Sequence, residues 1–536
     1  MIDVYKTGNM QTVHLQARRS QRSWWVMYLA LIGVSVASSV LMLRAQPSPA
    51  LLVWMLYLAG VVTTFYNPRY GVYLIIGLAL FGDGNLSAWY PFTKNLSSRE
   101  SLLYVSDAVI ISPLETYIVF TVLVWLGRMA VERRTQIYFG PMFWVVLLFV
   151  GFVTYGLGFG LSRGGNLVIA LWEARPIYYL FALLVLTGNL IRLRSQVNTL
   201  FWIITVSLFL KAITGVVYVA TVLQWDMGKV EVIAEHAMSI HFNIFFILMI
   251  AAWLYRDSLS RRLLMPLMAF PVIYSYFANH RRAGFLSLGI AVLLIVLLLY
   301  RENRKLFWAL TPSGTLGFMV YLAAFWNNEG SIGMIARAVR SVVGQPTARD
   351  TASNVYRDIE NMNIMFTISQ VSLRGLGFGQ RFYIIYQMPD ISTFEWWEYI
   401  THNSIMWIWM QIGVGGFFAM LLMIGMSMIL GGRLIWSMPY GELRAYALTA
   451  TLYILMHFIY AYVDMSWDTR SMLLVGMMMG LLNSLDLIAA RPLPVTAPRW
   501  PWQLAPSGQA PLPRLPAGRS PQLQAIRAWH EAETIL

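Results

Sequence analysis

The stretch 262–300, RLLMPLMAFPVIYSYFANHRRAGFLSLGIAVLLIVLLLY, shows the pattern that predicts the fold of this chain. It holds two apolar runs, 262–278 and 283–300, separated by a short turn with one histidine and two arginines at 280–282. An α-helix crosses the hydrocarbon core of a bilayer with about 20 predominantly apolar residues, and both runs come close to that length. The stretch therefore predicts two transmembrane helices joined by a cationic turn.

Apolar runs of this kind recur along most of the chain. Of the 536 residues, 58% are hydrophobic and 12% are charged, and the mean hydropathy is +0.59. This composition predicts an all-α polytopic membrane protein, with one large helical bundle in place of several soluble domains. We expect about 14 transmembrane helices, within a range of about 12 to 14. The expected spans are 24–43, 50–66, 69–82, 113–131, 139–160, 176–191, 198–223, 237–255, 262–278, 283–300, 306–326, 402–431, 442–463 and 470–488.

The basic residues are grouped in short connections between these spans. Lysine and arginine together number 39 against 25 for aspartate and glutamate, which gives a net charge of +14. In a membrane protein such clusters set the orientation and contact anionic lipids, so we expect membrane lipids and no nucleic acid as partners. With both termini in the cytoplasm, the basic clusters fall on the cytoplasmic side. These clusters are at 69, 128–134, 192–194, 256–262, 301–305 and 433–444.

The same pattern divides the chain into five parts. A cytoplasmic N-terminal segment, 1–23, precedes a transmembrane bundle at 24–326. A large outer loop, 327–401, is followed by C-terminal transmembrane helices at 402–488. The remainder, 489–536, is rich in proline, and we expect a disordered cytoplasmic tail there.

The loop 327–401 is the only outer segment large enough to cover an active site. Within it, 332–343 and 353–368 carry apolar residues at helical spacing, with polar residues on the opposite side. We expect two amphipathic helices that lie on a membrane surface.

The turn with His280, Arg281 and Arg282 falls on the outer side, where arginine is disfavoured. One interpretation is that these arginines reach outward to lipid headgroups. The other is a fixed cationic site, in which two guanidinium groups hold a phosphate or pyrophosphate and His280 supports them.

Further charged residues lie in the outer segments. Glu173 and Arg175 precede the predicted span 176–191, and they either neutralise one another or support the same cationic site. Arg357 belongs to the amphipathic helix 353–368, either on a solvated face or directed at a ligand. The glycines of RGLGFGQ, 374–380, predict a loop that re-aims the chain after this helix.

His402 and Asn403 stand at the outer start of the predicted span 402–431. Histidine is the side chain best suited to take up a proton near neutral pH, so His402 is a candidate general base. The alternative is that this segment only caps the helix. Asp464 and Asp468, at the outer end of a later span, could orient a basic group or bind sugar hydroxyls.

A metal site has little support in the sequence. The chain contains no cysteine, and its histidines at 236, 241 and 457 lack the spacing of a histidine metal site. We therefore expect neither a metal nor another cofactor.

Four segments, taken in order, resemble a known family. They are FANHRRAGFLSL (277–288), NVYRDIENMNIMFTI (354–368), LRGLGFGQRF (373–382) and THNSIMWIWMQIGVGGFF (401–418). Their order and spacing, with a long outer loop before the His-Asn pair, are similar to those of the O-antigen ligase and polymerase superfamily of bacterial envelopes. The resemblance covers roughly residues 160 to 480.

The resemblance implies a metal-independent, GT-C-like membrane glycosyltransferase that takes glycan from undecaprenyl pyrophosphate on the periplasmic face of the inner membrane. It implies that Arg281 or Arg282, together with Arg357, engages the donor pyrophosphate. His402, followed by Asn403, would lie at the active site. The acceptor would be a glycan, a lipid core or a protein.

Two other functions stay open. An O-antigen or exopolysaccharide polymerase of the same superfamily would use the same residues with a different acceptor. A transporter or flippase for lipid-linked sugar belongs to another class, and it would place ionisable groups near the middle of several spans. Lys211 is the only obvious basic residue inside a predicted span, so the sequence favours the enzyme.

Overall fold

The computed structural model describes residues 49–490 and the single positions 33 and 36, with gaps at 88–89, 93, 134–135, 227–231, 329, 345–347 and 390–395. Residues Ser48–Ala490 form one compact unit. The predicted N-terminal segment 1–23 lies outside the described residues, as does the predicted span 24–43 apart from two positions. The predicted tail 489–536 also lies outside them, except that residues 489 and 490 belong to the last described helix.

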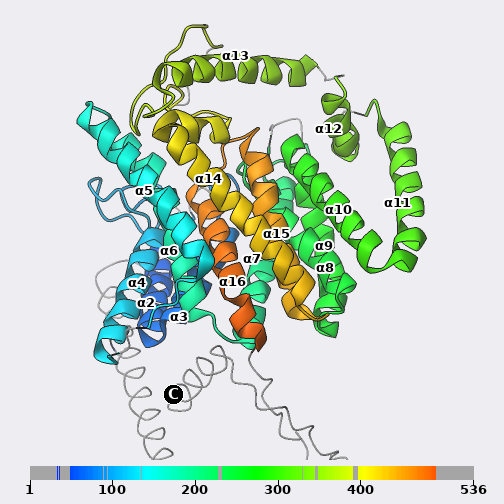
Figure 1. The fold of residues 1–536 in the computed structure, drawn as a ribbon, viewed down its shortest axis with the longest axis horizontal. Helices are drawn as coiled ribbons and strands as arrows, with labels where there is room; N and C mark the ends of the chain where they lie inside the picture. Colours follow the sequence, from blue (N-terminus) through cyan, green and yellow to red (C-terminus); the bar gives the residue numbers. More distant parts are fainter. Residues whose placement is uncertain are drawn as a thin grey trace, which may run out of the picture. The chain divides into compact units, whose positions relative to one another are not determined.

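Every regular element in the described part of the chain is a helix (Figure 1). In chain order these are α2 (Pro49–Tyr66), α3 (Pro68–Phe81), α4 (Pro113–Val131), α5 (Gly140–Ser162), α6 (Leu167–Leu190), α7 (Arg194–Thr221), α8 (Met238–Leu254), α9 (Leu259–Ala278), α10 (Arg282–Glu302), α11 (Arg304–Phe325), the 3-10 turn η2 (Ser331–Gly333), α12 (Met334–Val342), α13 (Ala348–Val371), α14 (Ser404–Ser437), α15 (Glu442–Ala461) and α16 (Thr469–Ala490).

By length and composition, eight of the described helices can each cross a membrane. These are α4, α5, α6, α7, α10, α11, α14 and α16. Three further helices, α2, α3 and α8, are apolar but short. The protein is therefore a multi-pass membrane protein whose described part is all-helical, as its composition predicts.

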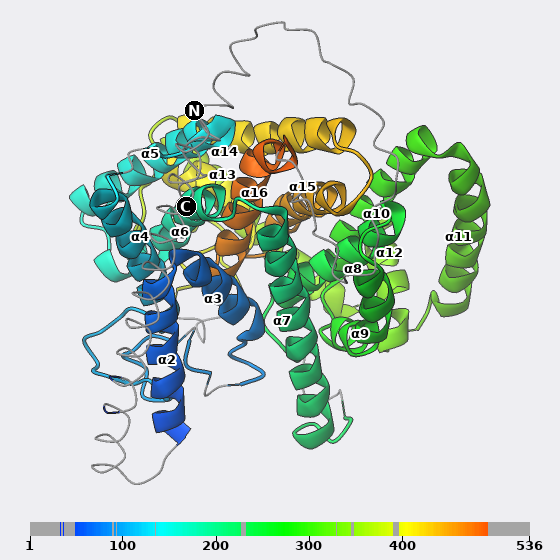
Figure 2. The same ribbon diagram turned by 90° about the horizontal axis from the view of Figure 1, so that it is seen from below.

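Two glycines allow α16 to lie close along α6. A Cβ atom on Gly476 would clash with the carbonyl oxygen of Leu180, and one on Gly480 would lie 2.5 Å from that of Leu184. Small residues are the usual means by which membrane helices approach one another, because lipid gives no hydrophobic drive for their association. Since α16 also packs against α14 and α15, most of its side chains are buried and it lies inside the bundle (Figure 2).

The connections gather at two ends of the bundle. At one end, which we call the site end, Gly84 N donates to Glu235 Oε1 at 2.7 Å, and His236 meets Asp464. At the opposite end, Arg444 pairs with Glu302. The connections that contain residues 83–112, 232–236 and 464–469 thus share the site end.

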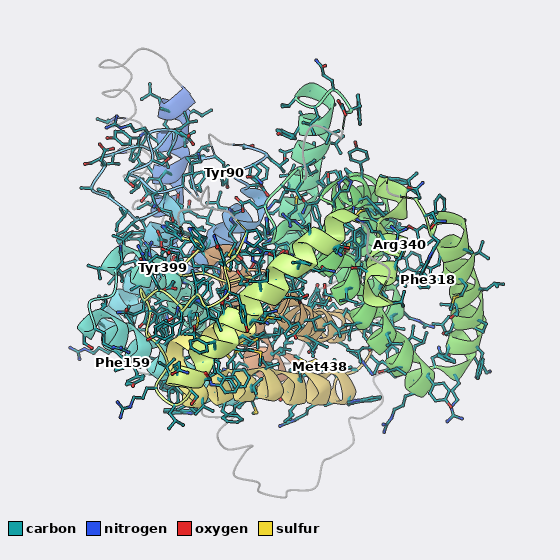
Figure 3. The ribbon with its side chains drawn as sticks, turned by 90° about the horizontal axis from the view of Figure 1, so that it is seen from above. Tyr90, Phe159, Phe318, Arg340, Tyr399 and Met438 are labelled. Atoms are coloured by element: carbon teal, nitrogen blue, oxygen red, sulfur yellow. The ribbon has the colours of Figure 1, made fainter. Side chains whose placement is uncertain are left out.

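α13 lies across the site end, above α14 (Figures 1 and 3). The two segments predicted as amphipathic helices are helical in the structure, as α12 and α13. Val355 and Met362, from the predicted apolar stripe, are 47% and 52% exposed, whereas Glu360 and Asn363 are buried. The buried side of α13 also includes Ile364, so α13 packs a mixed polar and apolar face on the bundle and leaves part of the predicted apolar stripe exposed.

The predicted start of the sixth span at residue 176 is wrong. α6 begins at Leu167, because Asn166 Oδ1 accepts a hydrogen bond from Val168 N at 3.0 Å and caps the helix. Pro176 lies inside the helix. Glu173 and Arg175 are consequently helical residues of α6, and they do not belong to a connection before it.

Candidate functional site

A glycine-rich segment after α13 packs against α5 and α14, next to the candidate site. Gly375, Gly377 and Gly379 all have positive φ angles, of 78°, 92° and 79°, which other residues rarely adopt. The segment lies directly on backbone, since Gly377 N donates to Gln411 O at 3.0 Å and Phe378 N donates to Gly156 O at 3.2 Å. The glycines thus change the direction of the chain, as predicted, and they also allow close backbone packing.

α14 is interrupted where it meets this segment. Gly413 has φ 70° and ψ −178°, so two helical stretches join at a kink. Val414 N donates to Ser372 O at 2.8 Å, and Leu376 N donates to Met410 O at 2.7 Å. These bonds satisfy backbone groups that the kink removes from the helix, and they fix the first turns of α14, which follow His402.

Glu173 holds the glycine segment from the side of α6. Its carboxylate accepts from Gly379 N at 2.6 Å and from Gln411 Nε2 at 3.2 Å, and its side chain is buried. Arg175 instead pairs with Glu115, with Nη1 to Oε1 at 3.1 Å, and donates to Ile110 O. The alternative that Glu173 and Arg175 neutralise one another is therefore wrong, because each has a separate partner.

His402 is held by a carboxylate from α13. Its Nδ1 lies 3.2 Å from both Oε1 and Oε2 of Glu360, and its backbone N donates to Glu360 Oε2 at 2.9 Å. The Glu360 side chain is 2% exposed and that of His402 is 24% exposed, so only the imidazole reaches solvent. With Nδ1 held in this way, Nε2 is the ring nitrogen available to a substrate.

The helix cap at this position is made by Asn403. Its Oδ1 accepts from Met406 N at 3.1 Å at the start of α14. Its Nδ2 is buried and has no hydrogen-bond partner among the described residues. Capping therefore accounts for Asn403 and leaves His402 for another role.

Asp464 joins several of the predicted residues in one cluster. Its Oδ1 lies 3.1 Å from His236 Nδ1, and its Oδ2 accepts from Tyr460 Oη at 3.0 Å. Burial by itself would raise the pKa of Asp464, but the hydrogen bond from His236 and the charges of His236, Arg281 and His402 lower this pKa below its usual value. Arg281 and His402 thus act on the same buried carboxylate.

The two arginines of the cationic turn have different surroundings. Arg282 begins α10, and its Nη1 donates to Ser341 Oγ of α12 at 2.5 Å. Arg281 precedes the helix, is half-buried, and acts electrostatically on Asp464. His280, beside them, has a φ of 50°, which is uncommon outside glycine and marks a constrained turn.

Arg357 lies three residues before Glu360 on α13. Residues at this spacing are neighbours on a helix surface, so Arg357 and Glu360 lie on the same side of α13. Arg357 is half-buried, and its Nε atom is buried with no hydrogen-bond partner among the described residues. Arg357 could therefore bind an anionic ligand at the site end.

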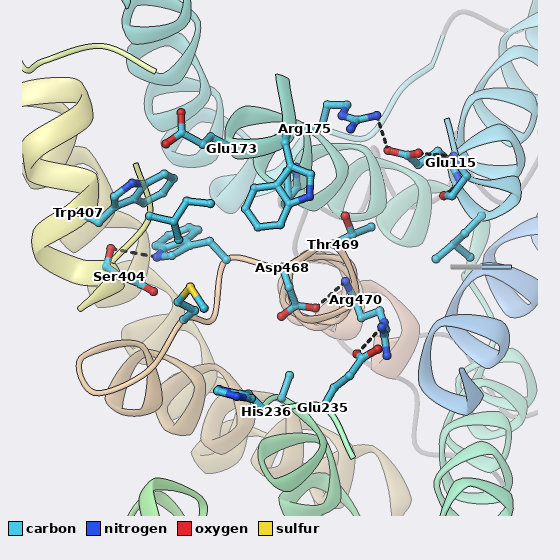
Figure 4. A pocket seen from close by; sticks show the side chains of 18 of the residues that line it. Glu115, Glu173, Arg175, Glu235, His236, Ser404, Trp407, Asp468, Thr469 and Arg470 are labelled. Atoms are coloured by element: carbon cyan, nitrogen blue, oxygen red, sulfur yellow. Dashed lines mark hydrogen bonds and ion pairs between the residues drawn. The ribbon is translucent and has the colours of Figure 1, made fainter. Parts of the chain in front are cut away.

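A cavity of about 440 Å³ opens beside this cluster (Figure 4). It is lined by Glu173 and Arg175, and Thr401 and Ser404 connect it to the two ends of the His402–Asn403 segment. The lining also includes charged residues that sequence reasoning had not selected for the site: Glu115, Glu235 and Arg470.

These missed residues carry only weak local signals. Glu115 forms a capping box with Ser112 at the start of α4, a pattern that predicts a helix start and nothing more. Arg470 pairs with Glu235 and donates to Gly82 O at 2.7 Å, so its partners come from two distant segments. Glu360 lies 42 residues before His402, and nothing in the sequence around it indicates that the two side chains are in contact.

Within the described ranges, no three histidine, aspartate or glutamate side chains converge in a group that could hold a metal ion. The fold and the site together define a multi-pass, all-helical membrane protein with a cluster of acids, arginines and histidines at one end of its bundle. No protein-family model matches the chain, and no curated protein matches it.

Proposed function

We propose that the protein is an O-antigen ligase-like membrane glycosyltransferase. It transfers a polysaccharide or repeat unit from undecaprenyl pyrophosphate to an acceptor hydroxyl, without a metal ion and with inversion at the anomeric carbon. The observation that carries this proposal is the Glu360–His402 pair, a carboxylate-held imidazole at the same end of the bundle as Arg281, Arg282 and Arg357. It adds to the resemblance of the four sequence segments.

In the proposed reaction, Glu360 fixes the imidazole through Nδ1, and Nε2 of His402 takes the proton of the acceptor hydroxyl. The acceptor oxygen attacks the anomeric carbon from the side opposite the leaving group, and the bond to pyrophosphate breaks. The leaving group departs with the electron pair. Arg281, Arg282 and Arg357 supply the positive charge that stabilises it where water is partly excluded.

The proposed orientation in the membrane is inferred from the distribution of the basic residues. We assign about 14 spans and a GT-C-like architecture, with both termini in the cytoplasm of a bacterium and the chain in the inner membrane. The site end then faces the periplasm, where lipid-linked glycans are polymerised or ligated. The predicted outer connections that meet at this end support the assignment.

Two alternatives differ in what they predict. A polymerase would use the same site with a growing glycan as acceptor, so only the acceptor distinguishes it from a ligase. A flippase for lipid-linked sugar would need ionisable groups that are free to act inside the bundle. Lys211 does not favour this function, since its Nζ lies 3.1 Å from Asp83 Oδ2, just beyond the end of α3.

The test uses the purified full-length protein in lipid nanodiscs with a polyprenyl-pyrophosphate glycan, with and without a lipid-core acceptor. We expect glycan to be attached to the acceptor or lengthened. His402→Ala, Arg282→Ala and Arg357→Ala should each abolish transfer while the folded yield is kept. Arg433→Ala, which removes an exposed arginine paired with Asp486, is the control and should retain activity.

Two outcomes would overturn the proposal. In the first, the donor is never consumed with any acceptor, while lipid-linked sugar crosses a vesicle membrane that contains the protein. In the second, the donor is consumed but all three site variants keep full activity, which removes the site assignment.

A further inference from the structure

The cavity at the site end has two chemically different walls. Trp407 and Ser404 lie on one side and Glu115 and Arg470 on the other (Figure 4). The indole NH groups of two lining tryptophans are already used, because Trp407 Nε1 donates to Tyr399 O at 3.2 Å and Trp467 Nε1 donates to Ser404 O at 3.1 Å. The tryptophans therefore offer the cavity apolar ring surface.

Both arginines in the wall are already neutralised. Arg175 pairs with Glu115, and Arg470 pairs with Glu235. A pyrophosphate would need cationic groups that are free to bind it, and here it would meet carboxylates beside each guanidinium. The cavity therefore disfavours an anionic ligand.

Asp468 supplies an acceptor for a ligand. Its Oδ2 accepts from Arg470 N at 3.0 Å and from Ser471 N at 3.2 Å. Its Oδ1 is buried and has no hydrogen-bond partner among the described residues. A buried oxygen without a partner is costly, so a donor from a bound molecule, such as a hydroxyl or an ammonium group, would be favoured at this position.

We infer that this cavity is a binding site for a neutral or amino sugar, next to His402. A pyranose ring has an apolar C–H face that fits against the tryptophans, and a rim of hydroxyls that can donate to Asp468 and the glutamates. A volume of about 440 Å³ is in the range of small-molecule sites, roughly 300–1,000 Å³. The inference rests on the proposed function, and it separates the site of the sugar from that of the pyrophosphate.

Binding is tested first without any reaction. Saturation-transfer-difference NMR with the full-length protein in nanodiscs would use maltose, cellobiose, lactose and chitobiose as probes. We expect saturation transfer to at least one of them, reduced at least tenfold by Asp468→Asn and by Trp172→Ala, whose ring lines the cavity and is 37% exposed. Inorganic pyrophosphate should not displace the sugar.

The chain offers a matched control for each variant. Asp486→Asn makes the same chemical change in α16 at a residue paired with Arg433, and Trp308→Ala removes a tryptophan that is 65% exposed on α11. Both should retain the signal. The inference is overturned if no disaccharide gives a signal, if the two cavity variants bind as the wild type does, or if pyrophosphate competes.

The transfer assay identifies which glycan the cavity holds. If it holds the acceptor, Asp468→Asn should raise the KM for the acceptor at least tenfold and leave the KM for the donor unchanged, and if it holds the donor glycan the effect is reversed. Unchanged values of both KM and kcat would overturn the sugar site while leaving the proposed transferase intact. Loss of the transferase function would appear separately, as a wild-type protein that never consumes donor.

Discussion

Glu360 precedes His402 by 42 residues, and it holds both the imidazole Nδ1 and the backbone N of His402. One carboxylate therefore fixes the position of the chain and the orientation of the ring together. The contact also links α13 to the start of α14, because Glu360 belongs to α13 and His402 lies just before α14. A change at Glu360 should affect catalysis through His402 and leave donor binding in place.

Glu360→Gln should lower kcat by about 10²- to 10⁴-fold, the usual contribution of an oriented general base. A glutamine keeps the size of the side chain, but one of its two terminal atoms is an amide nitrogen, which donates. Only its oxygen can accept, so it cannot hold His402 Nδ1 and the backbone N of His402 with two acceptor atoms as the carboxylate does. Steady-state kinetics should show an unchanged KM for the donor, and Glu360→Asp should restore part of kcat. A raised KM with an unchanged kcat would instead indicate that Glu360 supports donor binding and not proton transfer.

Arg281→Ala should reduce kcat/KM for the donor by about 100-fold, because a hydrogen-bonded charge contact to phosphate is worth about 1.5–3 kcal/mol and the lost contacts add to it. Arg281→Lys should recover only part of this, since an ammonium group cannot bind bidentately. Kinetics with varied donor concentration measure both effects.

Ser341→Ala provides the comparison for the neighbouring arginine. It removes the hydrogen bond that Arg282 makes to α12 and leaves both guanidinium groups in place. We expect a loss of less than tenfold in kcat/KM. A loss as large as that of Arg281→Ala would mean that the position of α12 matters as much as the cation.

Most of the helical fold can be predicted from the sequence, because bilayer-length apolar runs have few other structures. The cationic turn and the glycine loop were also visible, since positive φ angles at Gly375, Gly377 and Gly379 need residues without a Cβ atom. The helix start of α6 was missed, because Pro176 is compatible with a first turn as well as with an interior position.

The partners of the charged residues could not be predicted. Which carboxylate meets Arg175 depends on how α4 packs against α6, and periodicity does not contain that information. The two adjacent arginines diverge for a similar reason: Arg281 has φ −96° and ψ 103°, whereas Arg282 begins a helix, so their side chains leave the backbone in different directions. The apolar spacing of α13 likewise did not predict which side of this helix packs on the bundle.

The lowered pKa of Asp464 predicts a loss of stability in acid. The unfolded chain has a carboxyl pKa of about 3.9, so below that pH the unfolded state binds more protons than the folded state. The contribution of Asp464 is complete above pH 5 and decreases as the pH falls toward the lowered pKa of the folded state. Thermal unfolding between pH 3 and 7 should show this decrease.

Asp464→Asn should reduce the pH dependence in that window and lower stability near pH 7 by on the order of 1–3 kcal/mol, because His236 and Tyr460 lose a charged partner. Asp486→Asn, at the opposite end of the bundle, is the control and should retain the wild-type slope. An unchanged slope in Asp464→Asn would show that the acid sensitivity arises elsewhere.

Gly377→Ala should prevent the glycine segment from closing on α5. The φ of 92° is unfavourable for alanine, and a Cβ atom there would lie 2.5 Å from Gly160 N, against backbone that cannot move aside. Gly164 separates the effect of the φ angle from that of the steric clash, because it has a similar φ of 83° but open space around a Cβ atom. Gly164→Ala should cost about 1 kcal/mol, whereas Gly377→Ala should lose most of the folded protein, as measured by yield and monodispersity in detergent. Equal behaviour of the two variants would mean that backbone conformation alone, and not close packing against α5, explains the glycine at position 377.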